Sequence, residues 1–248
     1  MQTVSKGRAL RLLVRVLFLS ILFLAFGCVT CLLSMQLGGR SQAVDGDVKR
    51  TIILDAGHGG EDGGAVGVNG VLEKDLNLAV TEELARLFKE AGYTVILTRS
   101  DDCLLLGEGE DVRGHKKEYD LKNRLQVAKD NPDAIFVSIH MNTFSASKYS
   151  GLQVYYADGT ESRRLAYAVQ GAVVEGLQPE NRRVPHSADS SIYLLENAVG
   201  TAVLVECGFL SNPEECHLLS QKDYQARLSF SVFCGIIRYM ETLEGEGQ

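Results

Sequence analysis

Short β-branched or apolar runs alternate with longer amphipathic segments from Thr51 almost to the end of the chain. The strand-like runs cover residues 51–55, 93–98, 134–140, 152–156, 192–195 and 202–206. Helical spacing covers residues 73–91, 121–129 and 162–177, with further helical stretches from Pro213 and Tyr224. Strands separated by helices predict a three-layer α/β/α sandwich on a mixed, mostly parallel sheet. In such sheets, ligands bind beyond the carboxyl ends of the strands.

The charge of the chain is distributed unevenly. Residues 1–50 hold seven basic and two acidic residues, a net charge of +5, which leaves −12 for the remainder of a chain whose formal charge is −7. An acidic domain lacks the basic face that phosphate binding requires, so we expect no nucleic acid partner. A length of 248 residues and 45% apolar residues predict one globular domain with an N-terminal extension.

The N-terminal extension has the pattern of a membrane anchor. Four basic residues (Lys6, Arg8, Arg11 and Arg15) precede an uncharged run over residues 16–35. Twenty helical residues span roughly the 30 Å hydrocarbon core, and basic residues stay on the cytoplasmic side. We therefore expect a cytoplasmic segment at 1–15, a signal anchor at 16–35 and a linker at 36–50, with the domain outside the membrane. A cleaved signal peptide and a lipoprotein signal ending at Cys28 fit the run less well.

Three expected strands lead to a side chain that can bind a metal or a proton. His58 follows the first strand within AGHGG, His140 ends the central one, and Glu206 ends the late one. Glu73 opens the first long helix directly after the glycine-rich connection from His58. A carboxylate in a first helical turn is also what the helix dipole favours, so Glu73 alone could be a capping acid. The recurrence at three strand ends predicts a functional site.

This set of side chains matches the needs of a catalytic zinc ion. Such an ion commonly takes three ligands from His, Asp and Glu and leaves a fourth position for water. His58, His140 and one glutamate can supply them, with Glu206 as the carboxylate that moves protons. The second ligand stays open between Glu73 and Glu61, because His58-Gly59-Gly60-Glu61 is also the H-x-x-E pattern of zinc carboxypeptidases.

The other histidines and the cysteines give weaker signals. His115 lies in a charged stretch, His217 in a helical one, and His186 in a loop that could border a cleft. Cys207 adjoins Glu206, but neighbours on a strand point to opposite faces, so we expect its thiol to face the core. Cys103, Cys216 and Cys234 lack paired metal-ligand spacing, and the sequence does not indicate which of the four could pair.

Four motifs together resemble the zinc-dependent N-acetylmuramoyl-L-alanine amidases of the Amidase_3 family. They are LDAGHGGEDGGAVG, EKDLNLAV, SIHMN and LVECGFLSNPEE, in that order, within a match over residues 51–240. The resemblance implies an α/β/α fold with one catalytic Zn²⁺ bound by His58, Glu73 and His140, and Glu206 as the acid/base. Glu61 is then a variable residue of the glycine loop.

The resemblance also implies a substrate, peptidoglycan, and a bond, the amide between the lactyl group of N-acetylmuramic acid and L-alanine. The catalytic domain would span residues 51–242. Many members carry Arg or Lys where this chain has Glu196, which bears on substrate contacts but not on the metal. Rival readings are a zinc carboxypeptidase acting on stem peptides and a non-catalytic wall-binding module.

The domain plan narrows the role further. Only a short tail follows the last expected helix, so we expect no wall-binding repeats there. A single amidase domain behind a signal anchor resembles sporulation amidases that prepare cortex peptidoglycan for muramic-δ-lactam formation. A general cell-wall autolysin is the alternative. Without a targeting domain, a recruiting or activating protein partner is also expected.

Overall fold

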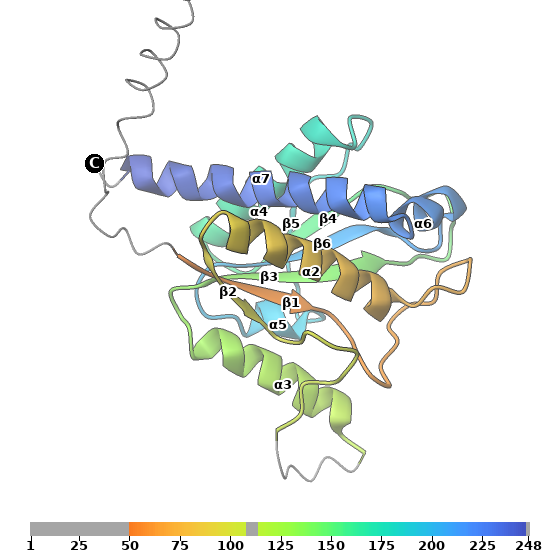
Figure 1. Cartoon of the computed structure of the whole chain (residues 1–248), viewed down its shortest axis with the longest axis horizontal. Helices are drawn as coiled ribbons and strands as arrows, with labels where there is room; N and C mark the ends of the chain where they lie inside the picture. Colours follow the sequence, from red (N-terminus) through yellow and green to blue (C-terminus); the bar gives the residue numbers. More distant parts are fainter. Residues whose placement is uncertain (1–49, 108–113, 247–248) are drawn as a thin grey trace, which may run out of the picture. The chain divides into compact units, whose positions relative to one another are not determined.

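A computed structural model describes residues 50–107 and 114–246, which belong to one compact unit (Figure 1). Its strands are β1 (Thr51–Ala56), β2 (Thr94–Leu97), β3 (Ile135–Asn142), β4 (Gln153–Tyr156), β5 (His186–Ser187) and β6 (Ala202–Phe209). Its helices are α2 (Glu73–Glu90), α3 (Lys116–Lys129), α4 (Thr160–Gly176), α5 (Tyr193–Glu196), α6 (Pro213–Leu219) and α7 (Lys222–Glu246). The expected α/β fold is therefore confirmed.

The strands form one six-stranded sheet in the order β2-β1-β3-β6-β4-β5. Strands β2, β1, β3 and β6 run parallel, and β4 pairs antiparallel with β6 while β5 runs parallel to β4. The sheet is mixed and mostly parallel, as predicted. Because β1, β3 and β6 are neighbours, the three strand ends that carry the candidate residues meet at one edge of the sheet.

Helices cover both faces of the sheet. Helices α2, α4 and α7 lie on one face and pack on a continuous apolar core that includes Leu84 and Val205, while α3 and α5 lie on the other (Figure 1). The second apolar cluster is smaller, and Phe136 and Leu204 belong to it. Fully burying a Val, Leu, Ile or Phe side chain contributes about 1.5–3 kcal/mol, so the larger core supplies most of the hydrophobic stabilisation.

Helix α2 shows how the sequence sets an element that positions the site. Its apolar side chains at 76, 80, 84 and 88 are buried at helical spacing, and Glu73 and Asp75 lie in its positively polarised first turn. The helix ends before Gly92, whose φ of 82° is a left-handed conformation that glycine adopts without strain. The predicted cap is confirmed, and the helix N-terminus delivers Glu73 to the edge of the sheet.

One expected strand is wrong. The run 192–195 was predicted as a strand, but residues Tyr193–Glu196 form the short helix α5. The Asp189 side chain accepts from the Ser191 N–H at 2.9 Å and turns the chain just before the run. Leu194 and Leu195 are buried from a helical turn in the smaller apolar cluster. A four-residue apolar run does not distinguish a strand from a turn of buried helix.

The predicted anchor at 16–35 lies outside the described residues, as do the segment 1–15 and nearly all of the linker. Among residues 50–107 and 114–246, no helix has the length and apolarity needed to cross a membrane.

Candidate metal centre and active site

Two histidines and one glutamate meet at the carboxyl edge of the sheet. Glu73 Oε1 lies 3.3 Å from His58 Nε2 and 3.0 Å from His140 Nδ1. One ligand atom from each residue lies within 4.8 Å of the others. Ligand atoms about 2.0–2.1 Å from a tetrahedral ion are separated by about 3.3 Å, so the three side chains fit a bound metal ion.

Glu73 is held as an ionised ligand. Its Oε1 accepts from the Met141 N–H at 3.1 Å, and its Oε2 accepts from the Ala65 N–H at 2.8 Å. Burial opposes ionisation, but His140 and His58 outweigh it and hold the pKa of the carboxyl far below its ordinary value. The carboxylate is therefore charged and oriented before any metal binds.

His58 has a conformation that the surrounding loop must maintain. Its φ is 61°, and it is the one non-glycine residue with a positive φ in the described part of the chain. Such a conformation costs about 1–3 kcal/mol and is typical of functional sites. Asp62 lies 3.0 Å from His58 Nδ1, which leaves Nε2 directed at Glu73. Burial opposes protonation, but Glu73 and Asp62 raise the pKa of His58. A carboxylate on the second ring nitrogen is the usual way of orienting a metal-binding histidine.

Two buried arginines hold the His58 loop from behind. Arg124 of α3 donates to the carbonyls of Ala56 and His58 at 2.7 and 2.6 Å. Arg99 donates to the carbonyls of Ala56 and Gly57 at 2.8 and 3.1 Å. These bonds use the carbonyls of three consecutive loop residues, so the loop position depends on both guanidinium groups.

The charge of Arg124 is balanced inside the protein. The guanidinium is 1% exposed and pairs with Asp55 at 2.6 Å and with Asp120 at 2.8 Å. Burial opposes ionisation of Asp55, but Arg124 and hydrogen bonds from Ser138 and Thr98 hold its pKa below the ordinary value. The network therefore joins Asp55, next to the end of β1, to Arg124 of α3 and Ser138 of β3.

Glycines allow the ligands to approach the backbone. A Cβ on Gly57 would lie 2.2 Å from His140 Nε2. A Cβ on Gly64 would lie 2.6 Å from Glu73 Oε2 and 2.8 Å from His58 Cδ2. The spacing of glycines in the loop thus follows from the volume of the three candidate ligands.

Glu206 lies beside the metal centre on β6. It is the register partner of His140, and its Oε2 is buried without a hydrogen-bond partner among the described residues. Burial raises the pKa of its carboxyl to about 7; Glu73 adds to the shift, and His140 and His58 oppose it. One position further, Cys207 is fully buried in the core under α2 and α7, as its strand position predicted. A carboxyl with a free oxygen and this pKa can exchange a proton near neutral pH.

The remaining candidates lie elsewhere. Glu61 pairs with Lys116 at 2.8 Å and is exposed, so the H-x-x-E alternative is wrong in this structure. His115 is exposed at the start of α3, and His217 is exposed on α6. His186 on β5 lies beside Tyr155, with 6.3 Å between ring centroids. All four cysteines in the described residues are free.

Several supporting residues were missed from the sequence, namely Asp62, Asn77, Arg99, Arg124 and Asp55. Asp62 and Asn77 each follow a candidate ligand by four residues, a spacing that could have marked them. Asn77 donates to the Gly57 carbonyl at 3.0 Å and lies 3.4 Å from Glu73 Oε1. The buried arginines carry no comparable local signal.

A small cavity of about 40 Å³ borders His58, His140 and Arg124.

Comparison with known proteins identifies the class to which this fold and site belong. The Amidase_3 profile, described as N-acetylmuramoyl-L-alanine amidase, matches residues 52–238. The chain belongs to this family and is an N-acetylmuramoyl-L-alanine amidase, a hydrolase.

Particular relatives are similar over most of the domain. The chain is 37% identical over 191 residues to the germination-specific N-acetylmuramoyl-L-alanine amidase of Bacillus subtilis, covering 77% of this chain and 79% of that one. It is 40% identical to the CwlD amidase of Clostridioides difficile, solved in complex with the GerS lipoprotein; the match covers 78% of this chain and all of that one, with a TM-score of 0.74. The amidase AmiC2 of Nostoc punctiforme is 29% identical, covering 79% and 99%, with a TM-score of 0.66.

Proposed function

We propose that this protein hydrolyses the amide between the lactyl group of N-acetylmuramic acid and L-alanine, with one zinc ion bound by His58, Glu73 and His140. The observation that carries the proposal is the spacing of 3.0 and 3.3 Å around Glu73 Oε1, beside a buried glutamate with a free oxygen. Two imidazoles and one carboxylate are a donor set that zinc hydrolases commonly use.

The residues divide the chemistry between them. When bound, zinc polarises the scissile carbonyl and makes water acidic enough to attack near neutral pH. Asp62 keeps Nε2 of His58 directed inward, and Met141 and Ala65 keep the Glu73 carboxylate in place. Glu206 accepts a proton from the attacking water and delivers it to the leaving L-alanine nitrogen.

Product analysis tests the reaction. Purified peptidoglycan is incubated with the protein and zinc, and soluble fragments are identified by mass spectrometry. Stem peptides with a free N-terminal L-alanine support the amidase. Release of single C-terminal residues would instead support a carboxypeptidase, and no release despite bound zinc would support a non-catalytic wall-binding role.

A variant tests the role of Glu206. Glu206→Gln keeps the size of the side chain but cannot take up the proton, so turnover should fall by about 10²–10⁴-fold. Zinc content should remain that of the wild type. Substantial activity in this variant would contradict the acid/base assignment.

The cellular role we propose is maturation of spore cortex peptidoglycan, leading to muramic-δ-lactam. The similarity to the B. subtilis germination-specific amidase and to C. difficile CwlD supports this role. Deletion of the gene should remove muramic-δ-lactam from the cortex and leave vegetative wall turnover unchanged. Defective vegetative cell separation with an intact cortex would favour a general autolysin.

We further propose that residues 16–35 anchor the chain in the membrane, with the catalytic domain outside, and that a protein partner recruits or activates it. The charge pattern of residues 1–35 supports the anchor. The complex of C. difficile CwlD with GerS supports a partner. Protease added to intact cells should digest the domain, and affinity purification from sporulating cells should recover the partner.

A further inference from the structure

A row of polar side chains crosses the sheet from the metal centre. His140, Glu206 and Gln153 are register partners on β3, β6 and β4, so their side chains leave the same face of the sheet. Gln153 Oε1 accepts from Arg183 Nη1 at 3.0 Å. Arg183 therefore contacts the side chain one strand beyond Glu206, and neighbouring strands lie about 4.8 Å apart.

Arg183 is held in a defined orientation. Its Nε donates to the Ser150 carbonyl at 2.8 Å, while Nη1 is bonded to Gln153. The guanidinium carbon lies 4.4 Å from the ring centroid of Phe209 and 5.8 Å from that of Tyr149. A guanidinium stacked on aromatic rings and fixed by two acceptors loses little freedom on binding a ligand.

Arg183 forms no ion pair in the described part of the chain, although it acts electrostatically on Glu215: burial raises the pKa of this carboxyl, and Arg183 opposes the shift. Glu215, the buried acid of the same pocket, accepts from the N–H groups of Gly151 and Phe209 at 2.8 and 2.7 Å. No carboxylate among the described residues lies within ion-pair distance of Arg183, and its Nη2 donors have no acceptor there. The site therefore presents a positioned cation with free donors.

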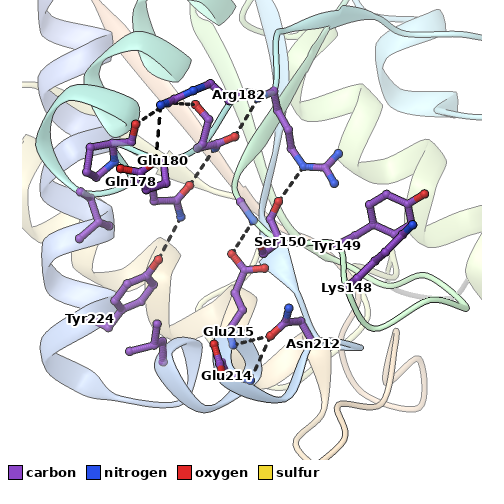
Figure 2. Close-up of a pocket in the computed structure, with 16 residues that line it drawn as sticks. Lys148, Tyr149, Ser150, Gln178, Glu180, Arg182, Asn212, Glu214, Glu215 and Tyr224 are labelled. Carbon is purple, nitrogen blue, oxygen red and sulfur yellow. Dashed lines mark hydrogen bonds and ion pairs between the residues drawn. The ribbon is translucent and has the colours of Figure 1, made fainter.

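Arg183 also lines an open pocket of about 680 Å³. In Figure 2, Tyr149 and Lys148 lie on one side of this pocket and Tyr224 on the other, with Glu215 between them. The volume is within the range of ligand-binding clefts and can hold several peptide residues. Arg183 thus links the two features, because it bonds to Gln153 of the polar row and also lines this pocket.

We propose that Arg183 binds a carboxylate of the departing stem peptide and makes the enzyme selective for that charge. This inference rests on the proposed function. In peptidoglycan, the residue after L-alanine carries an α-carboxylate, which is a carboxamide in amidated walls. Two extended residues span about 7 Å, so a peptide leaving Glu206 toward β4 brings this group near Arg183. Charge-assisted bonds to a guanidinium fork favour the carboxylate over the neutral amide.

Two muramyl peptides that differ only in this group test the inference. The purified full-length protein with zinc should hydrolyse the carboxylate form with kcat/KM about tenfold higher than the carboxamide form, mainly through KM. Arg183→Met should abolish the preference by slowing only the carboxylate form. Arg86→Met is the matched control, because Arg86 of α2 does not line this pocket and pairs with Glu83 and Glu90, and it should keep the preference.

The outcomes separate the two proposals. Equal kcat/KM for both substrates in the wild type, or an unchanged preference in Arg183→Met, would overturn the role of Arg183 while leaving the amidase reaction intact. If the methionine variant does not fold, Arg183→Lys decides, because lysine keeps the charge but not the fork, and the preference must fall several-fold. Failure to release stem peptide from either substrate or from whole peptidoglycan would instead refute the proposed function.

Discussion

Replacing Arg124 by methionine should strongly destabilise the domain and loosen the metal site. The guanidinium donates to two carboxylates and two carbonyls, and its side chain is 1% exposed. Methionine fills most of the volume but leaves Asp55 and Asp120 buried without their ion-pair partner. Removing one partner of a buried ion pair typically costs about 3–5 kcal/mol.

Urea unfolding of the metal-free protein measures the effect. Arg86→Met is the matched control, since Arg86 also contacts two glutamates but lies on the exposed surface of α2, and its unfolding midpoint should hardly move. Competition with a chromogenic chelator should show weaker zinc binding in Arg124→Met alone, because His58 loses the donor to its carbonyl. Equal unfolding midpoints for both variants would refute the stabilising role of the network.

The pH dependence provides a further check on the same residue. In the wild type, the pKa of Asp55 is held below its ordinary value, so its stabilisation is present above that value and is lost as the pH falls through the folded pKa. Without Arg124, burial instead raises the pKa of Asp55. The destabilisation of Arg124→Met should therefore shrink as the pH falls from 7 towards 4. A difference that stays constant over this range would contradict the electrostatic explanation.

Three further changes test the site. The carboxyl of Glu206 has a pKa of about 7 in the folded protein and 4.5 in the unfolded chain, so it opposes folding only when it is ionised. Glu206→Gln should therefore stabilise the metal-free protein by about 3 kcal/mol more at pH 8.5 than at pH 4. Urea unfolding midpoints at both pH values check this. Asp62→Asn should weaken zinc binding by about 10–100-fold, measured by chelator competition. Gly57→Ala should displace His140 and impair zinc binding. Gly171→Ala in α4 is the control: a Cβ there meets nothing within 4 Å, so this variant should slightly raise the melting temperature.

The positions of His58, His140 and Glu206 could be predicted because each is the first histidine or glutamate after a mostly apolar run. Strands covered on both faces are continuously apolar, so a titratable residue at the end is conspicuous. The choice of Glu73 or Glu61 as the second metal ligand depends on the path of the glycine-rich loop. Gly59 pairs with Asp62, and the chain turns back so that Glu61 reaches solvent while the start of α2 reaches the site. Local sequence did not specify this turn.

Arg124 illustrates what the sequence pattern concealed. It lies in a helix rich in lysine, where a charged residue is usually solvated. Its burial depends on Asp55, 69 positions away, and on loop carbonyls of another element. The antiparallel direction of β4 relative to β6 was concealed in the same way, because a short apolar run does not indicate in which direction the strand lies. Both features are set by long-range pairing rather than by local spacing.

The two faces of the sheet explain how the fold tolerates an unfavourable site. The Oε2 atom of Glu206 is buried without a hydrogen-bond partner among the described residues, and His58 is held at a positive φ; both features reduce stability. They lie on the face where α3 and α5 cover only a small apolar cluster. The opposite face packs against α2, α4 and α7 in the larger apolar core, and residues such as Val205 are fully buried there. Because alternate residues of β6 serve the two faces, the strand that carries Glu206 also secures the core through Val205 and Cys207. Catalytic strain on one face is thereby offset by hydrophobic burial one residue away on the other.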